Sequence, residues 1–94
     1  KVALKLLGWV VEQDEIEGRQ DSVSGAANLV NLGNAYGSLG DYEKQRSMLE
    51  RALKIFETAY GSHHPQVVLT LMKLEIAYGS LGYFGRMRSM LEPD

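Results

Sequence analysis

Apolar residues recur every three or four positions along most of this chain, which is the spacing of one face of an α-helix. One such stripe comprises Leu29, Leu32, Gly33 and Tyr36. A later one comprises Met48, Leu49, Ala52, Leu53 and Phe56, on a background of strong helix formers. The pattern predicts an almost wholly helical chain, with helices over 2–17, 22–39, 42–59, 65–81 and 84–92.

Turn-forming residues separate these stripes. Gly40 is followed by Asp41, whose carboxylate suits the N-cap of the next helix. Gly61 marks the end of that helix, and Pro65 fits the first position of the following one. The predicted unit is therefore a helix, a short turn and a second helix.

The chain also repeats itself. The hexapeptide AYGSLG stands at residues 35–40 and again at 77–82, and an alignment of 29–50 with 71–92 gives 13 identities in 22 pairs. Self-similarity at one fixed period, here 42 residues, is typical of stacked-repeat proteins. We expect the hexapeptide to serve packing and turns, with Gly33 allowing close approach of helices and the tyrosines wedged between neighbours.

The residues of the first unit carry a resemblance to the tetratricopeptide repeat family, through Leu32, Gly33, Tyr36, Gly40, Tyr42 and Ala52. Repeats of that family typically span about 34 residues. The 42-residue period and the linker GSHHPQV are similar to the longer repeats of the kinesin light chain type. HEAT and armadillo repeats have similar lengths but lack the Gly-Tyr pattern. The resemblance implies an all-α, right-handed solenoid of antiparallel helix-turn-helix units that acts as a protein-interaction scaffold without catalysing a reaction.

The repeat register divides the chain into three parts. Residues 1–18 correspond to the second helix of a preceding, partial repeat, since Leu6, Leu7, Val10 and Val11 align with Met48, Leu49, Ala52 and Leu53. Residues 19–60 form the full repeat, and 61–94 form a degenerate one in which Glu75 replaces Gly33. Because the chain begins with lysine, we expect it to be a fragment of a longer protein.

Composition narrows the function classes. The 94 residues carry a formal net charge of −2 and are 45% hydrophobic, which indicates one small globular domain. Because basic residues do not outnumber acidic ones, nucleic acid or an anionic membrane is not expected to be the main partner. The chain has no cysteine, so disulfides and thiolate chemistry are excluded, and a reducing, cytoplasmic location is compatible. No apolar run approaches the roughly 20 residues of a membrane span.

Few residues suggest chemistry. The adjacent His63 and His64 lack a third metal ligand nearby, and His64 fits a His-Pro helix start. The serines lack a nucleophile motif and the glycines lack a phosphate-loop pattern, so we expect no cofactor. Acidic residues at the end of the first helix are predicted to form a solvated face: Glu12, Asp14, Glu15 and Glu17. Trp9 is predicted to pack between helices.

One arrangement favours binding. By register, the first helix of the full repeat presents one face to the inner wall of the superhelix, comprising Ala27, Val30, Asn31, Asn34 and Ser38. The equivalent face of the next repeat comprises Leu69, Met72, Lys73, Ile76 and Ser80. The amides of Asn31 and Asn34, one helical turn apart, can both donate to and accept from a peptide backbone. The family resemblance assigns them this role, and implies that Lys73 holds a carboxylate. We therefore predict that Asn31, Asn34, Ser38 and Lys73 bind an extended peptide, acidic or C-terminal in character.

Three alternatives stay open. The polar residues could simply face solvent, the chain could be a structural or oligomerisation module stacking through its ends, or it could regulate a larger protein. Self-association is also predicted, because the first helix bears a broad apolar arc: Val2, Leu4, Leu6, Leu7, Trp9, Val10 and Val11.

Overall fold

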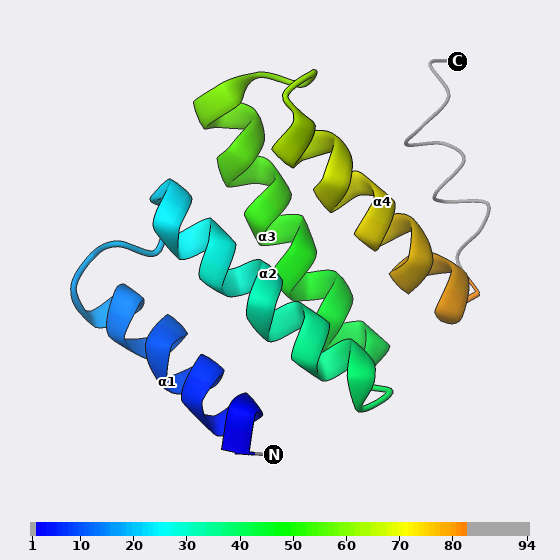
Figure 1. The fold of residues 1–94 in the computed structure, drawn as a ribbon, viewed down its shortest axis with the longest axis horizontal. Coiled ribbons are helices and arrows are strands. Elements are labelled where there is room, and N and C mark those ends of the chain that lie inside the picture. The colour runs from blue at the N-terminus through cyan, green and yellow to red at the C-terminus, as the bar shows by residue number, and fades with distance from the viewer. Residues whose placement is uncertain (1, 83–94) are drawn as a thin grey trace.

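The computed structural model describes residues 2–82. Four helices follow one another, α1 (Val2–Ile16), α2 (Val23–Ser38), α3 (Tyr42–Tyr60) and α4 (Pro65–Ser80), and within residues 2–82 there is no strand. Consecutive helices run antiparallel and pack side by side in chain order (Figure 1). The predicted all-α fold and its first four helices are confirmed, with ends that differ by one residue at most. The helix predicted over 84–92 lies outside the described residues.

Each of the last three helices begins at a side-chain cap. The Ser22 hydroxyl accepts a hydrogen bond from the Gly25 amide (3.0 Å), and the Asp41 carboxylate accepts one from the Lys44 amide (3.3 Å). At α4, the imidazole Nδ1 of His64 accepts from the Gln66 amide (3.1 Å), directly before Pro65. Such caps satisfy backbone donors that have no partner within the helix. The predicted helix starts at Asp41 and Pro65 are confirmed, and His64 has a structural role.

The helices end at glycines with a left-handed backbone. Gly40 and Gly82 close the two copies of AYGSLG with φ angles of 83° and 79°. A side chain with a Cβ is strained in this region, which explains why both copies keep glycine there. The predicted turn role of these two residues is confirmed.

The core lies where α2 and α4 meet α3. Leu29, Leu49, Phe56, Leu74 and Tyr78 are each at most 2% exposed. Close approach of α2 to α3 depends on glycine as predicted, since a Cβ on Gly33 would stand 3.3 Å from the Cβ of Met48. The Tyr78 hydroxyl donates to the Glu50 carboxylate, which ties α4 to α3 at the equivalent of the half-buried Tyr36.

Glu50 also accepts from Arg46 (2.9 Å), whose guanidinium donates to Glu43 as well (2.9 Å). The Glu43 hydrogen bond, followed by the nearby charge of Glu50, raises the pKa of Arg46 above its ordinary value despite partial desolvation. The guanidinium therefore keeps its charge beside the α3–α4 contact.

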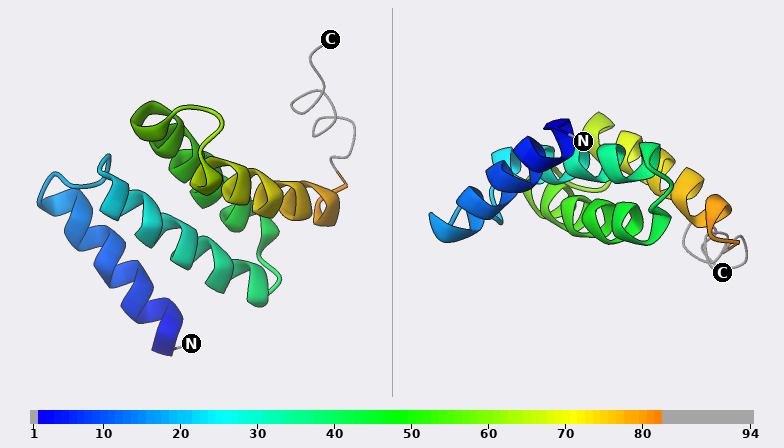
Figure 2. Two further views of the ribbon diagram at one scale, coloured as in Figure 1. Left: turned by 45° about the horizontal axis from the view of Figure 1, so that its top comes forward. Right: turned by 90° about the horizontal axis from the view of Figure 1, so that it is seen from below.

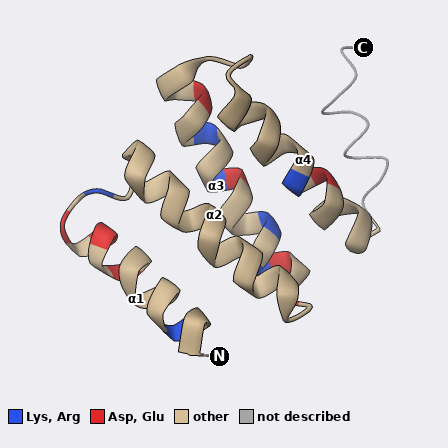
Figure 3. Ribbon diagram, in the orientation of Figure 1, with Lys and Arg blue, Asp and Glu red and all other residues tan. Residues whose placement is uncertain are grey.

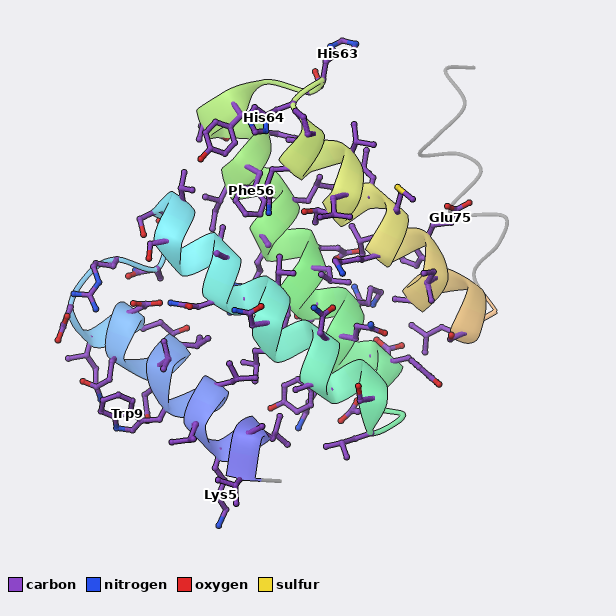
Figure 4. All side chains as sticks on the ribbon, in the orientation of Figure 1. Lys5, Trp9, Phe56, His63, His64 and Glu75 are labelled. Carbon is purple, nitrogen blue, oxygen red and sulfur yellow. The ribbon has the colours of Figure 1, made fainter. Side chains whose placement is uncertain are left out.

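Helix α1 covers α2 with one face only. Leu4, Leu7 and Val11 pack against the core, whereas Trp9 is 58% exposed. Figure 4 shows the Trp9 side chain directed away from the rest of the molecule. The prediction that Trp9 packs between helices is therefore wrong: at 100° per residue it lies opposite the buried side of the helix.

The prediction of a solvated acidic face is wrong at Asp14, which is only 4% exposed. Its carboxylate accepts a hydrogen bond from the Asn28 amide of α2 (2.8 Å) and pairs with the Arg19 guanidinium (3.3 Å). These partners offset the cost of desolvating the charge. Glu12, Glu15 and Glu17 are exposed, as predicted.

Candidate functional site

The predicted binding residues lie on α2 and α4, which occupy the same structural position in successive repeats. Figure 2 (right) shows α2 and the first half of α4 on the same side of α3. Four positions on each helix define what we call the helix-A face. They are Ala27, Asn31, Asn34 and Ser38 on α2, and Leu69, Lys73, Ile76 and Ser80 on α4.

On α2 the four positions share one side of the helix. At 100° per residue they fall within an arc of about 60°. Asn31 and Ser38 are exposed and Asn34 is half-buried. Within residues 2–82 neither the Asn31 nor the Asn34 side chain makes a hydrogen bond, so both amides are available to a ligand.

Val30 does not belong to this face. It is 8% exposed and forms part of the core cluster with Leu29 and Leu32. The prediction that Val30 lines the binding face is wrong, because one step of about 100° from Asn31 turns its side chain toward the interior.

The α4 half of the face is more apolar. Leu69 is 46% exposed and Ile76 is 66% exposed, while Lys73 between them is half-buried. Their equivalents Ala27 and Asn34 remain accessible on α2, although α2 is covered by both α1 and α3. These positions are therefore accessible to solvent even on a helix that has neighbouring helices on both sides.

Met72 and Val68 differ from them in this respect. They are 55% and 46% exposed, but their equivalents Val30 and Ala26 are buried in the full repeat. By register these two positions face neighbouring helices, so we exclude Val68 and Met72 from the helix-A face.

Charge is sparse here. Helix α2 carries no Lys, Arg, Asp or Glu, and α4 carries only Lys73 and Glu75 (Figure 3). Glu75 replaces the close-packed Gly33 and is exposed, with its side chain directed away from α3 (Figure 4). Lys73 therefore supplies the positive charge of the helix-A face.

Two pockets formed by the described residues lie beside this face. Ser38 lines one of about 220 Å³, between the start of α1 and the end of α2, together with Ala3, Leu4, Ala35 and Leu39. A pocket of about 380 Å³ lies against α3 and contains none of the predicted residues: it is lined by Asp21, Arg51, Lys54, Ile55, Thr58 and Ala59. Unlike Asn31, Asn34 and Lys73, Ser38 thus lines one of these two pockets.

Comparison with protein families decides the classification. The family model described as Tetratricopeptide repeat matches residues 25–84, which is more than half of the chain. The chain belongs to the tetratricopeptide repeat family. A comparison with curated proteins gave no match.

Tetratricopeptide repeats generally serve as protein–protein interaction modules and are typically non-catalytic. In this tetratricopeptide repeat protein, the matched residues include α2, α3 and α4. Within residues 2–82 no helix is long and apolar enough to cross a membrane.

Two features of this repeat protein were not predicted from its sequence. The Asp14–Asn28 contact joins residues 14 positions apart, and the pattern of single residues does not show which polar groups meet. The other is the spacing of exposed apolar residues on α1, where Val2, Trp9 and Ile16 follow one another at intervals of seven. That spacing was visible in the sequence, but the buried side of α1 was needed to show that all three face outward.

Proposed function

We propose that this protein binds an extended segment of a partner protein along the helix-A face. The main support for this proposal is that equivalent sides of α2 and α4 are accessible to solvent. Together these two sides present two neighbouring amide side chains and one lysine. Family membership supports a protein partner. The lack of cysteine is compatible with our expectation of a cytoplasmic protein.

The α2 half suits a peptide backbone. Asn31 and Asn34 are one turn apart, and each amide offers a donor and an acceptor that no other group in residues 2–82 occupies. Because a backbone presents the same groups at every residue, this half would hold a chain in the extended form with little preference for its sequence.

The α4 half suits particular side chains. Lys73 favours a carboxylate, either an acidic residue or a peptide C-terminus, and α2 adds no competing charge. Leu69 and Ile76, on either side of Lys73 along the helix, favour apolar groups next to that carboxylate.

The expected affinity is modest. Two hydrogen bonds are worth roughly 1 kcal/mol each, and a partly exposed ion pair about the same or less. After the peptide's ordering cost, the dissociation constant should be micromolar or weaker.

A peptide-library screen followed by titration of the best binders tests the proposal. Asn31→Ala and Lys73→Ala should each weaken binding about fivefold, and added salt should reduce the Lys73 effect. Lys54→Ala removes a lysine from α3, outside the helix-A face, and is the matched control. Binders that are insensitive to both Asn31→Ala and Lys73→Ala would place the ligand elsewhere and contradict the proposal.

A further inference from the structure

The side of α1 that faces away from α2 carries a regular stripe, which we call the outer stripe. Its members are Val2, Lys5, Trp9, Glu12 and Ile16, spaced alternately by three and four residues. Val2 is 73% exposed, Trp9 58% and Ile16 71%, and both charged members are exposed. Alternating three- and four-residue spacing is the pattern with which one helix packs along another.

The repeat register shows that this side stays open inside the stack. The equivalent positions on α3 are Lys44, Ser47, Arg51, Lys54 and Thr58, all polar. Four of them are exposed and Ser47 is half-buried, although α3 lies between α2 and α4. The outer stripe therefore faces outward from the repeat, and packing within residues 2–82 does not account for its three large apolar side chains.

We propose that the outer stripe is a self-association surface, on which α1 pairs antiparallel with α1 of a second copy. A two-fold axis beside Trp9 would place the two Trp9 side chains together. The same axis would place Val2 of each copy beside Ile16 of the other. A two-fold interface requires such self-complementarity, because the same patch serves both partners.

The charges favour this arrangement. Lys5 and Glu12 lie on the same flank of the stripe, one turn either side of Trp9. In the antiparallel pair Lys5 of each copy lies beside Glu12 of the other, which gives two ion pairs. A parallel pair would place this flank beside the Leu6 and Gln13 flank of the second copy and lose both ion pairs. One lysine and one glutamate also leave the stripe without net charge, which suits its own copy better than a strongly charged partner.

Access to the stripe is unobstructed in the structure. Helix α1 lies at the outer edge of the molecule (Figures 1 and 2). The Lys5 and Trp9 side chains point away from the rest of the molecule (Figure 4). A single pair of 15-residue helices buries less than the roughly 1,600 Å² of a standard interface, so the dimer should be weak, on the order of 100 micromolar.

Sedimentation equilibrium of the 94-residue chain over micromolar to millimolar concentrations tests this inference, together with Trp9 fluorescence. The expected result is a monomer–dimer equilibrium in which emission shifts to shorter wavelength as the dimer forms. Trp9→Ala should weaken association at least tenfold, and Lys5→Glu or Glu12→Lys about fivefold each. The double variant Lys5→Glu/Glu12→Lys should return to within about twofold of the parent, because both ion pairs are restored with reversed sign.

Lys54→Glu is the matched control, since it reverses a charge at the α3 equivalent of Glu12 and should leave association unchanged. A monomer at every concentration overturns the proposal, and so does a dimer that Trp9→Ala leaves intact. Failure of the double variant to recover overturns the antiparallel pairing. The outer stripe is separate from the helix-A face, so Trp9→Ala should leave peptide binding unchanged and the two proposals can fail independently.

Discussion

The packing of α1 on α2 and that of α3 on α4 use the same register positions with different chemistry. At 14 and 28 the first contact has Asp14 hydrogen-bonded to Asn28. Forty-two residues later the same positions hold Phe56 and Thr70, which are both buried, and the Thr70 hydroxyl donates to the Gln66 carbonyl of its own helix (2.8 Å). At these two positions the α1–α2 contact thus holds a hydrogen-bonded polar pair, whereas the α3–α4 contact holds a buried phenylalanine and a threonine bonded within its own helix.

The connections differ in the same way. Residues 17–22 link α1 to α2, and the shorter 61–64 link α3 to α4. The longer loop passes so near α2 that a Cβ on Gly25 would collide with the Arg19 carbonyl oxygen. At the equivalent position Val67 is fully buried. The 42-residue register therefore specifies where the helices lie, whereas the residues that fill each helix contact depend on the local loop and side chains.

The largest expected effect comes from Gly25. Substitution Gly25→Ala should lower the free energy of unfolding by about 1–3 kcal/mol, because backbone atoms of the loop would have to move. Urea denaturation followed by circular dichroism measures this. The matched control is Gly8→Ala, where no described atom beyond the neighbouring residues and the backbone of α1 itself lies within 4 Å of the added Cβ. This substitution should stabilise the helix by about 0.5–1 kcal/mol. Equal stabilisation by both substitutions would show that the loop does not restrict residue 25.

A smaller effect is expected from the polar pair. Asn28→Ala should cost about 1–2 kcal/mol, in the lower part of the range for unpairing a buried polar group, because Arg19 still pairs with Asp14. A double-mutant cycle with Asp14→Ala should give less destabilisation than the sum of the single changes. Thr70→Val, at the equivalent of Asn28, should cost less than about 1 kcal/mol. Strict additivity of the Asp14 and Asn28 changes would rule out their coupling.

The helix caps provide the smallest test. Ser22 and His64 are equivalent positions, and each accepts from a backbone amide at the start of its helix. Each alanine substitution should cost about 1 kcal/mol. His64→Ala should cost somewhat more, because the imidazole also stacks on Tyr60 with ring centres 4.1 Å apart. His63→Ala, at an exposed neighbour, should change the free energy of unfolding by less than about 0.5 kcal/mol. Thermal unfolding would detect these differences, and an equal cost at His63 and His64 would argue against the cap.

The helices, their order and the repeat could all be predicted from the amino-acid sequence. Periodic apolar residues, capping groups and turn glycines act through contacts within a few residues, so the helix starts at Asp41 and Pro65 and the turns at Gly40 and Gly82 could be predicted. The exposed sides of α2 and α4 followed from the same periodicity, which is why Asn31, Asn34 and Lys73 were placed on equivalent faces. Which side of α1 is covered could be learned only from the packing of the helices. In the structure Asp14 and Val30 are buried and Trp9 is exposed. Burial depends on which neighbouring helix lies against each side of a helix, and helical spacing alone does not specify that neighbour.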